Sequence, residues 1–367
     1  MSTPTTSTTL TEASRQWASR PADERYTSLL ALQQHTHAIR DHSRAVVVPS
    51  TSLRAVPTDA NHQRLAVVGV NGHPYAPTHW SFGQLASLAG APAGYLRTLP
   101  AELSADLITY GLQIAREAEE VGVLLTRAGD EPVLRAATGP RYGRVWNAEI
   151  IDHLVDRFGD GVTGEWRVPG EFGKAVEVTT QNTTLYASDR DCFVFLADEA
   201  RRIEVPNRRD GKSGSMARGF FIWNSEVGAA TFGLKTFLYD YVCCNRIVWG
   251  AQDVREIRIR HTALAPERFL DEIRPALESY ADACTTSVTQ AIEDARAKRL
   301  GDRVETFLAE RFGRGLVSSI QTAHRLEEGR PVETVWDAVV GATAVARSYV
   351  HQDARVALEE AAGALLG

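Results

Sequence analysis

One run of the sequence, from Arg218 to Gly250, limits what this chain can fold into more than any other. Its segment Gly219–Trp223 is apolar throughout, which is typical of a strand buried on both faces of a sheet. Residues 224–228, Asn-Ser-Glu-Val-Gly, have the composition of a turn, so residues 229–235 should return as an antiparallel partner strand. The run therefore places a buried antiparallel sheet at the centre of the fold.

Local patterns on either side of this hairpin predict further elements. Thr236 is suited to cap a short helix that ends near Asn245, because apolar residues recur on one helical face after it. Those residues are Phe237, Leu238, Tyr241 and Val242. Much earlier, Arg44–Val48 and Leu65–Val70 are short β-branched runs that we expect to be two strands.

The order of these patterns predicts the fold class. Strand and short-helix patterns alternate before the central run, whereas the sequence after Ala265 is helical almost throughout, with Pro275 expected to kink or divide its first long helix. We therefore expect an α+β protein with a central, mostly antiparallel sheet and flanking helices, followed by an all-helical C-terminal region. The predicted divisions are a disordered tail at 1–11, an α+β core domain at 12–262 and a helical region at 263–367 packed on that core.

Composition limits the classes of function. Hydrophobic residues make up 44% of the 367 residues and charged residues 23%, which is ordinary for a globular protein in water. The formal net charge of -6 excludes a surface that is basic throughout, so a site for a polyanion has to be local. The sequence has neither a signal peptide nor an apolar run of the roughly 18 residues that span a membrane, so we expect no membrane partner and a cytoplasmic location.

Cysteine and histidine spacing gives no reason to expect a metal or another cofactor. The cysteines lack the paired spacing of a zinc site, and we expect them to be reduced, packed thiols. They are Cys192, Cys243, Cys244 and Cys284. His324, in the helical region, is expected at the surface or at a helix cap.

The most basic stretch of the chain is the first candidate for function. Six basic residues fall within eighteen positions, between strands and among glycines: Arg201, Arg202, Arg208, Arg209, Lys212 and Arg218. Basic side chains on a glycine-softened loop can follow the phosphates of an irregular polyanion, although a solvated surface hairpin has the same composition. A nucleotide-binding P-loop at Lys212 is excluded, because Pro206 stands where that motif requires glycine.

Two other segments fit the same kind of ligand. Arg141, Tyr142, Arg144 and Trp146 lie in a loop just before a helix that Asn147 is suited to cap and that should end at Phe158. Arginine beside aromatic rings suits stacking on bases or sugars, although Tyr142 and Trp146 can also pack beneath the loop. In the strand pattern near residue 258, Arg258 and Arg260 face away from the apolar side.

Catalysis has little support in the sequence. We find no Gly-x-Ser-x-Gly elbow, no His-Glu-x-x-His and no Gly-x-Gly-x-x-Gly after a strand. Glu226, in the predicted turn, is the one weak catalytic candidate, and the alternative is a carboxylate that accepts hydrogen bonds and stabilises the turn. Whether the protein is an enzyme stays open, with the balance against it.

Several short motifs resemble a known family. Asn224-Ser-Glu-Val-Gly, Phe237-Leu-Tyr and Cys243-Cys-Asn-Arg-Ile-Val, with the later Trp336-Asp-Ala-Val-Val-Gly-Ala-Thr and residues 353–363, are similar to patterns of the domain of unknown function 932 family. The resemblance covers most of the chain after Arg44 and implies a phage or plasmid context, without catalytic residues to transfer. Asn245-Arg246 departs from the more usual Asn-Gly of that pattern.

These observations lead to one functional hypothesis with two alternatives. The chain is predicted to be a nucleic-acid-binding protein of a phage, prophage or plasmid, acting on single-stranded DNA or in annealing during replication or recombination, as a homo-oligomer. The first alternative is an oligomeric interaction or defence-related protein without catalysis. The second is an uncharacterised enzyme that acts on nucleic acid.

Overall fold

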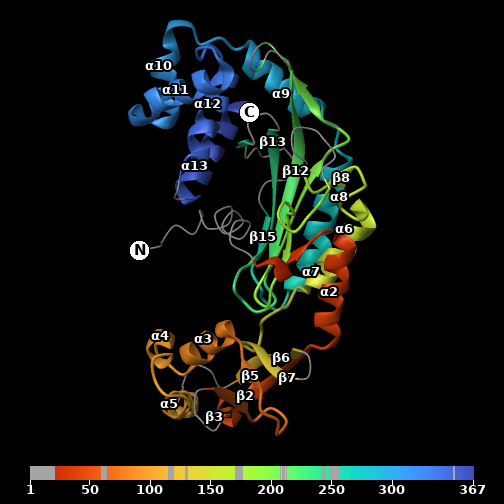
Figure 1. Ribbon diagram of the computed structural model, residues 1–367, viewed down its shortest axis with the longest axis vertical. Coiled ribbons are helices and arrows are strands. Elements are labelled where there is room, and N and C mark those ends of the chain that lie inside the picture. The colour runs from red at the N-terminus through yellow and green to blue at the C-terminus, as the bar shows by residue number, and fades with distance from the viewer. Residues whose placement is uncertain are drawn as a thin grey trace.

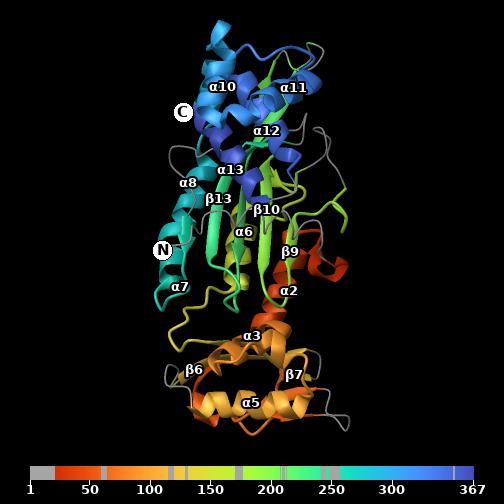
Figure 2. The same ribbon diagram turned by 90° about the vertical axis from the view of Figure 1, so that its left-hand side faces the viewer.

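The computed structural model describes residues 21–58, 64–114, 120–128, 131–169, 177–206, 208, 211, 213–240, 245–247, 257–349 and 352–367. The predicted α+β class is confirmed: a large antiparallel sheet lies at the centre, with a smaller lobe at one end and a group of C-terminal helices at the other (Figure 1, Figure 2). The predicted tail at 1–11 lies outside the described residues.

Nine strands of the described chain form the large sheet, and every pairing in it is antiparallel. The strands are β1 (Arg25–Tyr26), β8 (Trp166–Arg167), β9 (Leu185–Ala187), β10 (Cys192–Asp198), β11 (Ile203–Val205), β12 (Gly214–Asn224), β13 (Phe232–Asp240), β14 (Asn245–Ile247) and β15 (Ile257–Ile259). The sequence order predicts the central hairpin correctly, because β12 and β13 pair from Met216 with Asp240 to Trp223 with Gly233.

The predicted helix after Thr236 is wrong, because β13 continues as a strand to Asp240. The apolar residues after Thr236 fit a helical face, but β12 begins at Gly214 and offers unpaired backbone groups along its whole length. Pairing with that buried neighbour satisfies the backbone of β13 within the sheet, and this outweighs a local helical preference.

Helices cover one face of the sheet. They are α2 (Leu29–Asp41), α6 (Asn147–Phe158), α7 (Ala265–Arg268) and α8 (Arg274–Asp282), and Figure 1 shows α6, α7 and α8 on the same side of the strands. Alternate residues of β10 and β12, such as Leu196 and Phe220, join these helices in one hydrophobic core. The intervening residues, such as Phe195 and Phe221, form an aromatic cluster on the other face.

Residues 44–138 form the smaller lobe, here called the N-terminal lobe, with its own hydrophobic core. Its strands are β2 (Arg44–Pro49), β3 (Arg54–Pro57), β4 (Leu65–Val68), β5 (Ala76–Pro77), β6 (Glu120–Ala128) and β7 (Glu131–Thr138), and its helices are α3 (His79–Leu88), α4 (Ala93–Leu96) and α5 (Ala101–Ile114). Both β-branched runs are strands, as predicted; β2 pairs with β6, and β4 pairs with β3. The short strand β3 lies between β2 and β4 in the chain and is the partner of β4. Local composition did not predict β3.

The C-terminal helices pack on the far end of the sheet. After α8 come α9 (Thr286–Ala297), α10 (Val304–Phe312), α11 (Val317–Glu328), α12 (Val335–Arg347) and α13 (Gln352–Gly363). The apolar α12 is buried, and its core includes Met216 and Leu238 of the sheet. The division at Pro275 is confirmed, because a π-helical turn, Phe269–Ile273, separates α7 from α8 directly before it.

His324 is not at the surface or at a helix cap, contrary to the prediction from sequence. It is fully buried on α11, with Nε2 3.3 Å from Oδ1 of Asp337 and Nδ1 3.1 Å from the carbonyl oxygen of Arg330. Burial alone would raise the pKa of Asp337, but hydrogen bonds from His324, Arg330 and the backbone hold that pKa well below its usual range. The imidazole therefore serves to tie α11 to the start of α12.

Candidate functional site

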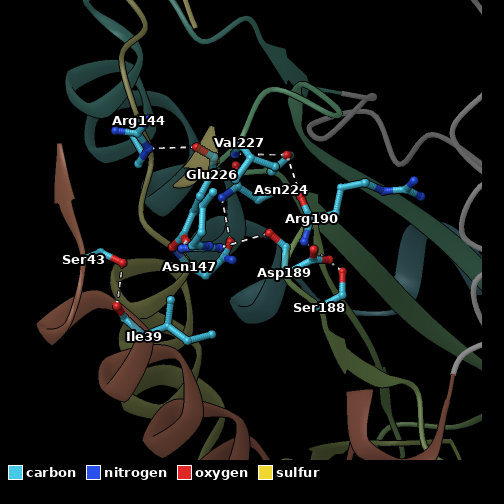
Figure 3. A network of polar contacts seen from close by, with 12 residues as sticks. Ile39, Ser43, Arg144, Asn147, Ser188, Asp189, Arg190, Asn224, Glu226 and Val227 are labelled. Carbon is cyan, nitrogen blue, oxygen red and sulfur yellow. Dashed lines mark hydrogen bonds and ion pairs between the residues drawn. The ribbon is translucent and has the colours of Figure 1, made fainter. Parts of the chain in front are cut away.

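The turn at residues 224–228 lies where the N-terminal lobe meets the large sheet (Figure 3). The chain crosses between the lobe and the sheet helices twice, at Ser43 after α2 and through loop 139–146 before α6. At the first crossing the Ser43 hydroxyl donates to the carbonyl oxygen of Ile39 over 2.7 Å, which closes the end of α2. We call the contacts around the turn the lobe joint.

Glu226 is the centre of the lobe joint. Its Oε2 accepts a hydrogen bond from Nη1 of Arg135 over 2.9 Å, and its Oε1 accepts one from the backbone N–H of Asn147 over 2.8 Å. Both partners of the ion pair are buried, with 2% of Glu226 and 4% of Arg135 exposed. The carboxylate therefore neutralises a strand arginine of the lobe and occupies the N-terminus of α6, where the helix dipole favours negative charge.

Asn147 does not cap α6 with its side chain, as the sequence had predicted. Its Oδ1 instead accepts a hydrogen bond from Nδ2 of Asn224 over 2.7 Å, and the same Nδ2 also lies 2.8 Å from the carbonyl oxygen of Val145. The cap comes from Glu226, which is distant in sequence. The end of the helix at Phe158 is as predicted.

Val227 joins the turn to α3 of the lobe. Its carbonyl oxygen accepts hydrogen bonds from Nε1 of Trp80 over 3.0 Å and from Nε2 of Gln84 over 2.7 Å. The Oε1 of Gln84 in turn accepts the N–H of Ala137 in β7 over 3.0 Å. One turn of the large sheet thus holds both a helix and a strand of the N-terminal lobe.

The surroundings of Glu226 do not favour a catalytic role. Both of its carboxylate oxygens are engaged by protein donors, and its side chain is buried. A general acid or base has to reach a substrate proton directly or through one water. The alternative considered from the sequence, a carboxylate that stabilises the turn, fits the geometry.

The aromatic residues of loop 139–146 lie in a continuous stack. The guanidinium of Arg144 lies 5.6 Å from the ring centre of Trp146 and 5.4 Å from that of Tyr142. Arg40 lies 5.8 Å from Trp146 at one end, and His261 stacks 4.9 Å from Tyr142 at the other. The order Arg40, Trp146, Arg144, Tyr142, His261 shows that these rings already stack on protein groups.

Hydrogen bonds fix this stack to the lobe joint. The Tyr142 hydroxyl donates to the carbonyl oxygen of Ser225 over 2.8 Å, and Nε of Arg144 donates to that of Glu226 over 2.8 Å. Burial raises the pKa of Tyr142 above its usual range, although Arg144 opposes the shift. Burial also lowers the pKa of His261 to about 4, with a further lowering by Arg144.

Two arginines of the basic stretch are buried in ion pairs. Nη2 of Arg218 lies 3.1 Å from Oδ2 of Asp198, and its Nη1 donates to the carbonyl oxygen of Tyr280. Nε of Arg208 donates to Oε1 of Glu328 over 2.7 Å, and each side chain of this pair is at most 2% exposed. The prediction that Arg208 and Arg218 contact phosphate is therefore corrected: Arg208 pairs with Glu328 of α11, and Arg218 joins β12 to β10 and α8.

The first two arginines of that stretch are also paired. Nε of Arg201 lies 2.8 Å from Oδ2 of Asp198, and its Nη2 donates to the carbonyl oxygen of Ala281. Arg202 forms an ion pair with Glu199. Arg202 thus has its own carboxylate partner, whereas Arg201 shares the carboxylate of Asp198 with Arg218.

The remaining predicted site residues fall into two groups. Arg141 and Arg260 are exposed, and Arg258 is half-buried. Arg209 and Lys212 lie outside the described residues. Arg141 and Arg260 directly precede two rings of the stack in the chain, Tyr142 and His261, and a backbone hydrogen bond from Gly143 to His261 joins the two segments.

Within the part of the chain that the structure describes, no group of three or more histidine, cysteine, aspartate or glutamate side chains is arranged to hold a metal ion. Cys192 is buried, whereas Cys284 is exposed, so the expectation of a packed thiol is wrong for Cys284. Cys243 and Cys244 lie outside the described residues. Among the described helices, none is long and apolar enough to cross a membrane.

Comparison with protein-family models, with curated proteins and with solved structures gave no match to this chain. The resemblance to the domain of unknown function 932 family stays a prediction.

Sequence reasoning missed the residues of the lobe that hold the joint, above all Arg135. A signal for it exists, because the segment Val133-Leu-Arg-Ala-Ala137 places one arginine in an otherwise apolar strand. A buried arginine needs a carboxylate partner. A buried Glu226 needs a cation in the same way. If both residues are taken as buried, the sequence therefore indicates that they form an ion pair.

Removing the central carboxylate tests the role of the joint. We expect Glu226→Ala to lower the free energy of unfolding by about 3–5 kcal/mol, because Arg135 would stay buried without its partner. Chemical denaturation measures this change. Glu272→Ala, which removes a carboxylate from an exposed ion pair with Arg268, is the control and should cost far less. Equal losses in the two variants would contradict the central role of Glu226.

The stack predicts a pH dependence of stability. His261 has a pKa of about 4 in the folded protein against about 6.5 when unfolded, so the unfolded chain binds the extra proton between these values. The contribution of His261 is complete above pH 6.5 and is lost as the pH falls towards 4, by at most about 3 kcal/mol.

Denaturation at pH 7 and pH 4 measures this effect. The loss of stability on acidification should be smaller in His261→Gln than in the unmodified protein. The same substitution at His73, an exposed histidine in the N-terminal lobe, should leave that loss unchanged. An identical acid loss in all three proteins would show that His261 does not titrate in this way.

Proposed function

We propose that the protein binds single-stranded nucleic acid at a surface made by loop 139–146 and residues 260–262, here called the arginine–aromatic surface. One observation carries the proposal: two exposed arginines, Arg141 and Arg260, directly precede in the chain two rings of a stack of aromatic and guanidinium groups, Tyr142 and His261.

Backbone contacts hold the two segments of this surface together. The N–H of Gly143 donates to the carbonyl oxygen of His261 over 3.2 Å, and Nδ1 of His261 lies 3.0 Å from the carbonyl oxygen of Gly143. A Cβ atom at Gly143 would lie 1.8 Å from the carbonyl oxygen of Thr262, so this close approach requires glycine. The two segments that carry Arg141 and Arg260 are consequently side by side, although they are far apart in sequence.

The chemistry of this surface suits a flexible polyanion. Exposed guanidinium groups contact phosphates without reading sequence, and flat groups in a stack offer their outer faces to unpaired bases. The inner faces of Tyr142 and Trp146 are taken by Arg144, so a base would extend the stack at its ends. Such a surface fits an open strand, whose bases are free to stack.

The proposal includes the context that the resemblance implies. A protein that holds single strands would act in the cytoplasm of a cell that carries a phage, prophage or plasmid, in replication, recombination or annealing. Two guanidinium groups give a small electrostatic footprint, so binding along a strand requires several copies of the chain.

Charge reversal tests the arginine–aromatic surface. We expect the double variant Arg141→Glu with Arg260→Glu to bind labelled single-stranded DNA at least about tenfold more weakly at low salt, because two phosphate contacts become repulsive. The slope of log affinity against log salt concentration should fall by about 1.4 for two contacts. Fluorescence anisotropy at several salt concentrations measures both effects.

A matched control changes the same charge elsewhere. Arg303→Glu with Arg325→Glu reverses two exposed arginines of the C-terminal helices and should leave binding close to that of the unmodified protein. Equal weakening in both double variants would indicate an effect of net charge alone. A lack of binding by the unmodified protein at about 50 mM salt would sink the proposal.

We also propose self-association through α5, which a separate observation favours. Four apolar residues, Leu103, Leu107, Tyr110 and Ile114, are 43–62% exposed along this helix. Their spacing of four, three and four residues is that of a seam between two helices. Figure 1 and Figure 2 show α5 at the end of the N-terminal lobe that is distant from the large sheet, where a second molecule can approach.

The charges on α5 favour a second copy of the chain in antiparallel orientation. Exposed Glu102 and Asp106 flank the N-terminal half of the seam, whereas Gln113 is uncharged near its C-terminal end. A parallel pair would bring the acidic residues of two copies together, and an antiparallel pair separates them. In that orientation the α5 helices of the two copies contact each other across a two-fold axis.

A charge in the seam tests this interface. Leu107→Lys should shift the protein from dimer towards monomer in size-exclusion chromatography with light scattering, because it would bury an unpaired ammonium group. Leu326→Lys is the control, since Leu326 is 74% exposed on α11 and should leave the mass unchanged. A monomeric unmodified protein, or a Leu107→Lys variant that keeps its dimeric mass, would contradict the proposal.

A further inference from the structure

A pocket of about 610 Å³ lies in the N-terminal lobe, away from the lobe joint. Its walls come from β4 and β5, from the start of α3, from α4 and from the start of α5. A pocket of this volume is in the range that holds a small organic molecule. Neither the lobe joint nor the arginine–aromatic surface uses the residues that line it.

We propose that this pocket binds a small organic anion, with a phosphate or carboxylate group on a flat apolar body. The apolar part of the lining supports the body of such a ligand. It includes Leu65, Pro77, Phe82, Leu96 and Leu99. Contact with these side chains would remove the apolar ring of a ligand from water, and this favours binding.

The polar part of the lining supports the anionic group. Among the described residues that line the pocket, Arg64 and Arg97 carry positive charge and Glu131 carries negative charge, while His79 adds an imidazole. Two guanidinium groups exceed one carboxylate, so the charge balance of these side chains favours an anion.

Arg97 is already oriented for this role. Its guanidinium lies 5.0 Å from the ring centre of Phe82, and its Nη2 donates to the carbonyl oxygen of His79 over 2.9 Å. A guanidinium has five N–H donors, and this hydrogen bond uses one of them. Arg97 thus joins the aromatic wall to the polar wall and keeps donors for a ligand oxygen.

Two hydroxyl groups of the lining, those of Ser104 and Thr78, have partners within the protein. Ser104 donates to the carbonyl oxygen of Leu96 over 2.6 Å, and Oγ1 of Thr78 accepts the N–H of Ser81 over 3.1 Å at the start of α3. These bonds stabilise the walls and leave recognition of the anion to Arg97.

Three fluorescent probes that share one ring system separate the contributions. They are 1-naphthyl phosphate, 1-naphthoate and uncharged 1-naphthol, each titrated into the full chain. We expect saturable, one-to-one binding of at least one of the two anions, about tenfold tighter than naphthol, since one charge-assisted contact supplies such a factor. The preferred anion identifies phosphate or carboxylate as the natural group.

Variants of Arg97 assign the site. Arg97→Gln should weaken the preferred anion about tenfold and leave naphthol unchanged, and Arg97→Lys should restore part of the loss. Arg54→Gln removes an exposed arginine of β3 that does not line the pocket, so it serves as the matched control. Thermal unfolding of each variant verifies that it is folded.

Three results would overturn the proposal: no saturable binding of either anion, equal affinity for naphthol and the anions, or equal loss in the Arg97→Gln and Arg54→Gln variants. The double variant Arg141→Glu with Arg260→Glu should bind the anionic probe normally. The pocket and the arginine–aromatic surface can therefore fail or succeed independently.

Discussion

The buried ion pair between Glu226 and Arg135 is the interaction on which the arrangement of this protein depends. It joins a turn of the large sheet to a strand of the N-terminal lobe, and the same carboxylate occupies the N-terminus of α6. A buried charge without its partner costs several kcal/mol, so neither residue is stable in place unless the other is there. The contact between the lobe and the sheet is consequently a buried contact that contributes to the stability of the fold.

The same principle explains the fate of the basic residues. Arg208 and Arg218 look like surface charges in the sequence, but each lies inside, opposite a buried carboxylate. Arg201 and Arg218 instead contact Asp198 of the sheet and backbone carbonyl groups of α8, and Arg208 pairs with Glu328 of α11. This moves the proposed nucleic-acid contact to Arg141 and Arg260, which remain exposed beside the stack of Tyr142 and His261.

Local patterns predicted much of the fold but little of the site. The hairpin of β12 and β13, the end of α6 at Phe158 and the division before Pro275 follow from short-range periodicity and from proline chemistry. The helix predicted after Thr236 failed, because the length of the neighbouring strand decides how far β13 continues. The exposure of the apolar residues on α5 could not be predicted either. Periodicity identifies an apolar stripe along a helix but does not show whether another element covers that stripe.

The sequence by itself determined the α+β class, the central antiparallel hairpin and the helical C-terminal region, because hydrophobic period and turn chemistry act over a few residues. Only the tertiary structure decided which charges are buried, which pair and which face water. Arg135 and Glu226 are 91 positions apart, and Arg208 and Glu328 are 120 apart. Whether an arginine binds a phosphate or a carboxylate of its own chain depends on which groups folding brings within hydrogen-bond reach and away from water.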